Sequence, residues 1–313
     1  MKTNARQSAP QAKWPTGLAL AGVVVGMVFL PLAGAMTRGQ HAERFLRFPF
    51  GGVRGGPVPV SWLAFVLLVA VIIVGLAVLT KRAAATVTTP GELRPRHPFP
   101  RWGWAAAIGG GGAWFIAWTR VPVFATIQPF TYLPLWLCFI VLLNGLTYRR
   151  CRGCLLTHQT AYFLLLFAAS APFWWLFEYC NQFARNWYYT GNQALSPVGQ
   201  LTLGTLSFAT VLPGVMSLAE SLEVHCTQWS WLSRFICVPW VNSQRVCAAA
   251  AGLAGAGLYA VGIWPDFLFP MLWVAPLVFF VGIQGMLGSL HILSPLAAGD
   301  WRRVCQLSAA GLL

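Results

Sequence analysis

Charged residues are scarce in this chain. Only 9% of its 313 residues are Asp, Glu, Lys or Arg, and only 7 of these are acidic. Soluble globular domains carry charge on about a quarter of their residues. The shortage therefore excludes an ordinary soluble domain and indicates that much of the surface faces lipid.

Long apolar stretches account for the missing charge. Hydrophobic residues make up 57% of the chain, in runs of about 20, the length that a helix needs to cross a hydrocarbon core. Such runs must be helical, because a lipid-exposed backbone has to satisfy its own polar groups. The alternating segments of a β-barrel are missing. We therefore predict an all-α, polytopic transmembrane helical bundle, a single integral membrane domain over 1–313. About eight spans are expected, at 17–36, 61–80, 103–119, 131–148, 160–179, 199–219, 246–264 and 267–290.

Both ends of the chain leave an alternative open. Basic residues precede the first apolar run and small residues at 33–35 follow it, which is also the layout of a cleavable signal peptide. An uncleaved span is favoured, because the chain that follows is itself polytopic. After the charged residues at 300–303 the sequence turns apolar again. That stretch forms either an interfacial helix or the beginning of a ninth span.

The positive charge gives an orientation. A net charge of +14 would suggest nucleic acid in a soluble protein. Here Lys and Arg flank the spans, and the inner loops carry more of them if the N-terminus is cytoplasmic. One outer loop contains Arg38, Arg44, Arg47 and Arg54, which is weak evidence for the opposite orientation. We predict a plasma (inner) membrane protein that contacts membrane lipids and no nucleic acid.

Two predicted spans contain small residues at spacings that favour close helix packing. The span at 103–119 has four consecutive glycines at 109–112, and the span at 246–264 has Ala248, Gly252 and Ala256 one turn apart. Small residues at four-residue spacing let helix backbones approach each other in lipid. We predict packing faces at both places.

The most informative polar group is Glu178. It lies at the outer end of the predicted span 160–179, where Trp174, Glu178 and Asn181 share one helix face. A carboxylate at the edge of a span is costly unless it is paired or faces a polar cavity. We therefore predict a ligand-binding site here, with Glu178 as its candidate catalytic group.

Three further residues are expected at this site. Arg120 ends the predicted span 103–119 on the same side of the membrane, and Trp187 and Tyr188 follow Asn181 closely. Arg120 is the expected partner of Glu178 or of an anionic headgroup. In the competing interpretation the aromatic residues only anchor the protein at the membrane interface, and Glu178 belongs to a structural ion pair.

Three other groups of residues are weaker candidates. Glu220, Glu223 and His225 are close in sequence but lack the further ligands of a metal site. We expect the helix end at Glu220 to lie in cytoplasmic water instead. Cys151 and Cys154 form a CxxC pair without a thioredoxin-like context. Asn144, inside a span, is expected to bond another helix. No metal or cofactor is predicted.

A resemblance covers about a quarter of the chain. Its motifs are PFTYLPLW at 129–136, WWLFEYCN at 174–181, NWYY at 186–189 and FATVLP at 208–213. In this order they resemble a group of uncharacterised bacterial multi-pass membrane proteins. The resemblance implies a bacterial inner membrane and brings no activity with it.

Three classes of function follow. The favoured one is binding or chemical conversion of a lipid-like or amphipathic molecule at the aromatic, Glu-containing site, with Glu178 as general acid or base if there is catalysis. Whether the protein is an enzyme stays open. The alternative is a non-catalytic membrane subunit or assembly factor. A transporter ranks last, because ionisable residues near the bilayer midplane are essentially missing. Protein partners are not indicated.

Overall fold

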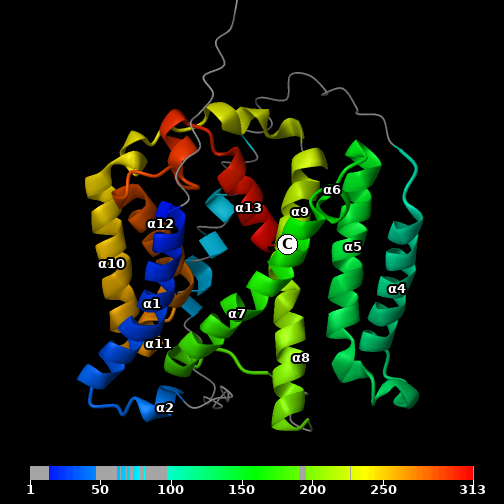
Figure 1. Cartoon of the computed structure of the whole chain (residues 1–313), viewed down its shortest axis with the longest axis horizontal. Coiled ribbons are helices and arrows are strands. Elements are labelled where there is room, and N and C mark those ends of the chain that lie inside the picture. The colour runs from blue at the N-terminus through cyan, green and yellow to red at the C-terminus, as the bar shows by residue number, and fades with distance from the viewer. Residues whose placement is uncertain are drawn as a thin grey trace, which may run out of the picture. The chain divides into compact units, whose positions relative to one another are not determined.

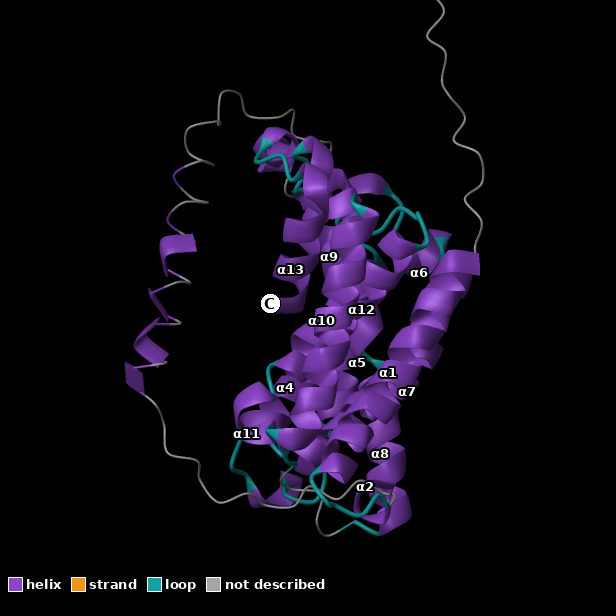
Figure 2. Ribbon diagram, turned by 90° about the vertical axis from the view of Figure 1, so that its left-hand side faces the viewer, coloured by secondary structure: helices purple, strands orange, loops and turns teal. Residues whose placement is uncertain are grey.

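The computed structural model describes residues 14–46, 97–189, 195–225 and 227–312, with isolated positions between 62 and 81. Within these residues all regular secondary structure is helical, and there is no strand (Figure 2). The predicted helical fold is thus confirmed for the part of the chain that is described. Most of the predicted span at 61–80 lies outside the described residues.

Five segments are long and apolar enough to cross a membrane. They are Thr16–Thr37, Gln128–Cys151, Thr160–Ala184, Pro197–Val224 and Gln244–Ile263. These five match predicted spans to within a few residues. A count of about eight is not confirmed. Helix α12 (Met271–Met286) has only 16 residues. Helix α4 (Arg101–Trp118) is not among the five, because its glycines, tryptophans and Arg101 lower its mean hydropathy.

The described fold divides into two compact units. The first unit contains α1 (Trp14–Thr37), α2 (Glu43–Leu46), α10 (Gln244–Ile263), α11 (Pro265–Leu268), α12 and the 3-10 turns Pro239–Asn242 and Ser294–Ala298. The end of α7 (Thr160–Ala184), from Leu176 onward, also belongs to it. Helices α1, α10 and α12 pack against one another (Figure 1).

Glycines set the spacing of this three-helix bundle. A methyl group on Gly262 of α10 would collide with the carbonyl oxygen of Pro31 in α1. The reverse holds for Gly34, whose added methyl would meet the carbonyl oxygen of Tyr259. On the other side of α10, a methyl on Gly282 of α12 would lie 2.8 Å from the carbonyl oxygen of Cys247. The helix backbones therefore touch at these points, as small residues allow in lipid.

The packing face predicted for α10 is wrong. Ala248, Gly252 and Ala256 are exposed, and nothing lies within 4 Å of a methyl built on Gly252. The buried face contains Cys247, Ala251, Ala254, Leu258 and Val261. Since α10 is rich in small residues all round, spacing alone did not identify the face that meets α1 and α12.

The second unit contains the other helices. They are α4, α5 (Tyr132–Cys151), α6 (Leu155–His158), the first part of α7, α8 (Pro197–Ala209), α9 (Val211–His225), α13 (Arg302–Leu312) and the 3-10 turns Pro122–Phe124, Gln128–Phe130 and Thr227–Arg234. Helices α4 and α5 pack together, with Gly109 and Gly110 against Cys138. Packing was predicted for the four glycines at 109–112. A methyl group built on Gly111 or Gly112, however, would have no neighbouring atom within 4 Å.

Helices α8 and α9 are one apolar segment broken at Thr210. Pro213 has no backbone N–H to bond the carbonyl of Ala209, so the helical ladder is interrupted here. The buried hydroxyl of Ser170, on α7, fills the gap: it donates to the carbonyl of Phe208 and accepts from the N–H of Leu212 at 3.0 Å. A break inside a membrane helix is tolerated when a neighbouring side chain satisfies the freed groups in this way.

The stretch after residue 300 forms the 11-residue helix α13. Its buried Gln306 donates to the carbonyl of Ala219 at 2.6 Å, and Arg303 lies 3.8 Å from Glu223. Helix α13 is therefore packed against α9.

The touching backbones at Gly262 give a first prediction. Gly262→Ala forces α1 and α10 apart, so we expect it to lower the free energy of unfolding by about 1–3 kcal/mol. Gly252→Ala, on the exposed face of the same helix, gains about 1 kcal/mol of helix propensity with no clash. Unfolding titrations with SDS in mixed micelles measure both. Equal stabilities for the two variants would contradict the close approach.

Candidate functional site

Glu178 and Asn181 lie in the last turns of α7, within the first unit. Their exposed fractions are only 5% and 4%. The Asn181 side-chain oxygen accepts from the N–H of Asn186 at 3.1 Å, and its backbone carbonyl accepts from the N–H of Arg185 at 2.8 Å. Arg185 has a left-handed backbone with φ 51°, which ends the helix. Asn181 was predicted as a ligand-binding residue, and the structure gives it a role in ending α7.

The residues next to Glu178 hold the end of α7 in place. The Tyr179 hydroxyl donates to the carbonyl of Val28 in α1 at 2.8 Å. The Phe177 ring stacks on Trp273 of α12, with ring centres 5.2 Å apart. One turn on, Phe183 stacks on Phe45 of α2 at 4.4 Å. Sequence reasoning missed these contacts, because the partners lie far away along the chain.

The aromatic residues predicted for the site belong to the second unit. Trp174 donates its indole N–H to the Tyr189 hydroxyl at 3.4 Å and packs on Phe208, with ring centres 5.8 Å apart. Trp187 is half-buried and Tyr188 is 55% exposed. Trp174 and Tyr189 thus form an aromatic cluster with Phe208, at the break between α8 and α9.

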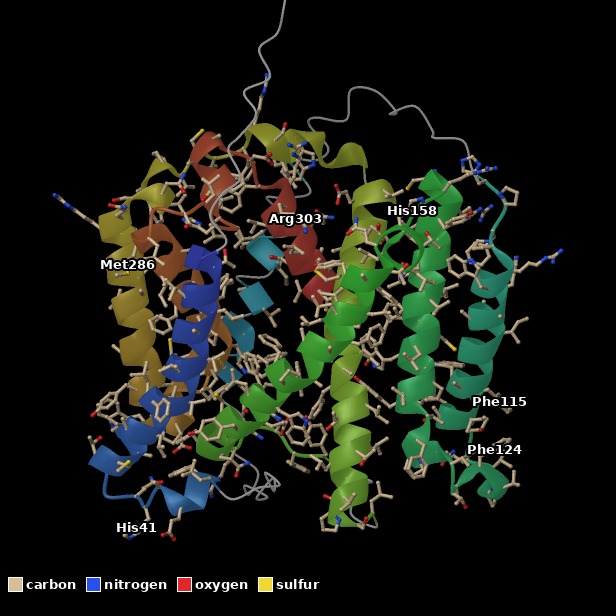
Figure 3. The ribbon with its side chains drawn as sticks, viewed as in Figure 1. His41, Phe115, Phe124, His158, Met286 and Arg303 are labelled. Atoms are coloured by element: carbon tan, nitrogen blue, oxygen red, sulfur yellow. The ribbon has the colours of Figure 1, made fainter. Side chains whose placement is uncertain are left out.

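Arg120 follows α4 in the second unit and is exposed. The loop that carries it is shaped by Gln128, whose amide donates to the carbonyls of Ile116, at 3.0 Å, and of Thr119. Rings of Phe115 and Phe124 meet beside this loop (Figure 3). Glu178 belongs to the other unit, so a pair between Arg120 and Glu178 stays a prediction.

A second polar cluster joins α5, α6 and α9. The fully buried Asn144 amide donates to the carbonyl of Ile140 and to the Ser217 hydroxyl, both at 2.9 Å. Its side-chain oxygen accepts from the N–H of Leu156 at 3.0 Å. The prediction that Asn144 bonds another helix is confirmed. Both N–H donors and the oxygen of the side chain bond protein groups, which is typical of a residue that fixes packing.

Glu220 extends this cluster, and the expected place of its helix end in cytoplasmic water stays a prediction. One carboxylate oxygen accepts from the N–H of Leu155 at 3.0 Å, and the side chain is half-buried. It therefore caps the first turn of α6, whose backbone N–H groups have no partner within the helix. Glu223 instead lies near Arg303 and Gln306. Among the described residues, no three His, Cys, Asp or Glu side chains come together to hold a metal ion.

The two cysteines of the CxxC pair have different surroundings. Cys151 is exposed at the end of α5, whereas Cys154 is 2% exposed. Burial raises the pKa of the Cys154 thiol, although hydrogen bonds with Thr157 lower it in part. A reactive cysteine needs a lowered pKa, so Cys154 lacks the environment of a redox thiol.

Comparison of the chain with protein-family models, with curated proteins and with solved structures found no match. The resemblance to bacterial multi-pass membrane proteins, based on the motifs between 129 and 213, therefore stays a prediction.

The Asn144 cluster leads to a second prediction. Asn144→Leu leaves the Ser217 hydroxyl and the N–H of Leu156 without their partner, and we expect a loss of about 1 kcal/mol of unfolding free energy. Ser217→Ala removes only one of these bonds. A double-mutant cycle measured by SDS unfolding is expected to give a coupling energy of about 0.6 kcal/mol between the two side chains. Strict additivity would show that their hydrogen bond contributes nothing.

A third prediction concerns thiol reactivity. Maleimide reacts with the thiolate, so we expect Cys154 to react at least about 10-fold more slowly than Cys151 at pH 7. Because its pKa is raised, labelling of Cys154 should increase only at a pH above the ordinary thiol pKa of about 8.5. Tandem mass spectrometry of the chymotryptic peptide 149–155 distinguishes the two sites. Equal labelling at pH 7 would contradict the burial of Cys154.

Proposed function

We propose that this protein is a multi-pass membrane protein that binds a lipid-like or amphipathic molecule at the Glu178 end of α7. The site lies near the outer face of a bacterial inner membrane, if the N-terminus is cytoplasmic. Glu178 is the polar group that recognises the molecule, and it is the candidate acid or base if the molecule is chemically changed. Burial of Glu178 inside a segment able to span a membrane is the observation that carries the proposal.

The cost of burying Glu178 supports a functional role. An acidic side chain at the centre of a membrane helix is unfavourable by about 3 kcal/mol on insertion scales, which is an upper bound for Glu178 near the end of α7. Such groups usually line a ligand, ion or proton path. The adjacent residues Phe177, Tyr179 and Cys180 are all buried as well.

Other residues hold this end of α7 in place around Glu178. Tyr179 bonds the backbone of α1, Phe177 stacks on α12 and Phe183 stacks on α2. These three contacts connect the last turns of α7 to three helices of the first unit. They leave a rigid support for Glu178, which is what a binding group requires.

Aromatic residues in the same segment suit an amphipathic ligand. Trp174 precedes Glu178 by one helical turn on α7, and the chain after the helix continues through Trp187 and Tyr188. Flat apolar walls with a small number of polar groups are typical of small-molecule sites.

A structural role is the second candidate, and the same burial supports it. An exposed fraction of 5% is also what a carboxylate sealed inside the protein would have. In that case the chain is a non-catalytic subunit or assembly factor whose polar residues fix helix packing. The hydrogen bonds of Asn144 and Asn181 to protein groups are of this kind.

Lipid analysis of the purified protein separates the two candidates, and this is the fourth prediction. We expect a lipid that co-purifies with the wild-type protein to be lost, or reduced at least about 10-fold, in Glu178→Gln, because the neutral amide binds a polar headgroup less strongly than a carboxylate does. The measurement is mass spectrometry of extracted lipids, normalised to protein.

Glu223→Gln serves as the matched control, because Glu223 lies on α9 in the other unit and its side chain is 66% exposed. Its lipid profile should equal that of the wild type. If Glu178→Gln leaves the profile unchanged and only lowers the melting temperature, Glu178 is structural and the binding proposal is wrong.

A further inference from the structure

A group of basic side chains lies at the opposite end of the second unit from the loop of Arg120. His97, Arg149, Arg150 and Arg152 form this basic corner, where the chain entering α4 meets the end of α5. The N–H of His97 donates to the carbonyl of Arg149 at 2.8 Å, and Arg152 Nε donates to His97 Nδ1 at 3.1 Å. In Figure 3, the neighbouring His158 marks this end of the unit, whereas Phe115 and Phe124 mark the other.

The basic corner is held in a fixed shape. Phe99 lies between α4 and α5, so that methyl groups on Gly103 and Gly145 would come within 2.7 and 3.1 Å of its ring. The ring of Trp102 meets that of Tyr148 with centres 5.9 Å apart. The segment that carries His97 is thus packed on the last turns of α5, and the arginine side chains extend from a rigid support.

Within the described part of the chain, the corner has donors but no acid paired with them. None of its three arginines forms an ion pair with a described residue. The Nε of Arg149 is buried and has no hydrogen-bond partner among the residues that the structure describes. Glu220, on the adjacent helix α9, is engaged with the N–H of Leu155. Because His97 Nδ1 already accepts from Arg152, the other ring nitrogen is left as a further donor.

Helix electrostatics explain only part of this arrangement. Arginine in the last turn of a helix interacts favourably with the helix dipole, which accounts for Arg149 and Arg150 on α5. The dipole does not explain a buried guanidinium nitrogen without an acceptor. The left-handed backbone of Arg152, with φ 55°, ends α5, and the Arg152 side chain bonds His97.

We propose that the basic corner binds a phosphate group, and that this phosphate is the headgroup of an anionic phospholipid. Planar guanidinium groups bind phosphate oxygens through paired N–H donors. The corner begins at the end of the apolar segment Gln128–Cys151, where a headgroup lies when the acyl chains follow the helix. Basic pockets between helices on the cytoplasmic side recognise such headgroups, and this end of α5 is the predicted cytoplasmic one. The site is independent of Glu178.

Native mass spectrometry of the intact protein in detergent tests this inference. We expect dioleoyl phosphatidylglycerol to bind the wild-type protein about 10–30-fold more tightly than dioleoyl phosphatidylcholine. The preference should fall to within about twofold in the double variant Arg149→Gln, Arg152→Gln. The control is Arg302→Gln, Arg303→Gln, which removes the same charge elsewhere in the second unit and should retain the preference. Glu178→Gln should retain it too, which keeps this test separate from that of the Glu178 site.

The comparison of the two lipids on the wild-type protein does not depend on whether a variant folds. Equal binding of the two lipids overturns the lipid as the source of the phosphate, and a preference that survives in Arg149→Gln, Arg152→Gln places the site elsewhere. A third arm adds inorganic phosphate. Competition with phosphatidylglycerol at millimolar phosphate supports a phosphate site in the corner. Stabilisation of the protein by phosphate without any lipid preference would identify free phosphate, and not a headgroup, as the ligand. If neither lipid nor phosphate distinguishes the wild type from the double variant, the proposal is wrong.

Discussion

The need to satisfy backbone polar groups without water governs the described part of this protein. In a hydrocarbon core an unpaired N–H or C=O costs several kcal/mol, on the order of a whole hydrogen bond. Continuous helices meet the need along most of the chain. Where Pro213 interrupts the ladder at Thr210, the hydroxyl of Ser170 bonds groups on both sides of the break. Where the short helix α6 begins, Asn144 and Glu220 accept from its first N–H groups.

The same constraint explains which parts of the fold the sequence predicts well. Apolar runs between charged loops located five spans to within a few residues, because crossing lipid requires length and hydropathy that are visible locally. Which face of a helix packs against its neighbours is harder to predict from the sequence. Gly252 and Gly262 lie ten residues apart on α10, yet only Gly262 touches another backbone. What distinguishes them is the position of α1, which is far away along the chain. For example, the hydrogen bond from the Arg38 side chain to the carbonyl of Ile263 joins residues 225 positions apart.

The candidate site also combines residues with a local sequence signal and contacts without one. Glu178 attracts attention because acids are so rare in the chain. The structure buries it, and its role in binding stays a prediction. Asn181 was singled out by helix spacing, but the residue ends α7, a role that follows from the left-handed Arg185 after it. The contact of Tyr179 with the backbone of Val28 had no local signal at all, because it joins residues separated by 151 positions. The sequence indicates only membrane orientation for Arg149, Arg150 and Arg152, because the contact with His97 joins residues 55 positions apart.

Photo-crosslinking tests the binding of a lipid-like molecule at Glu178 most directly. The protein would be purified from cells grown with a fatty acid carrying a diazirine in its chain, irradiated and mapped by mass spectrometry. Bulk lipid labels exposed side chains such as Trp104 and Trp118, which supply an internal reference. The account predicts an additional adduct on Glu178 or its buried neighbours, which bulk lipid does not reach. Adducts confined to exposed residues would contradict a lipid bound at Glu178.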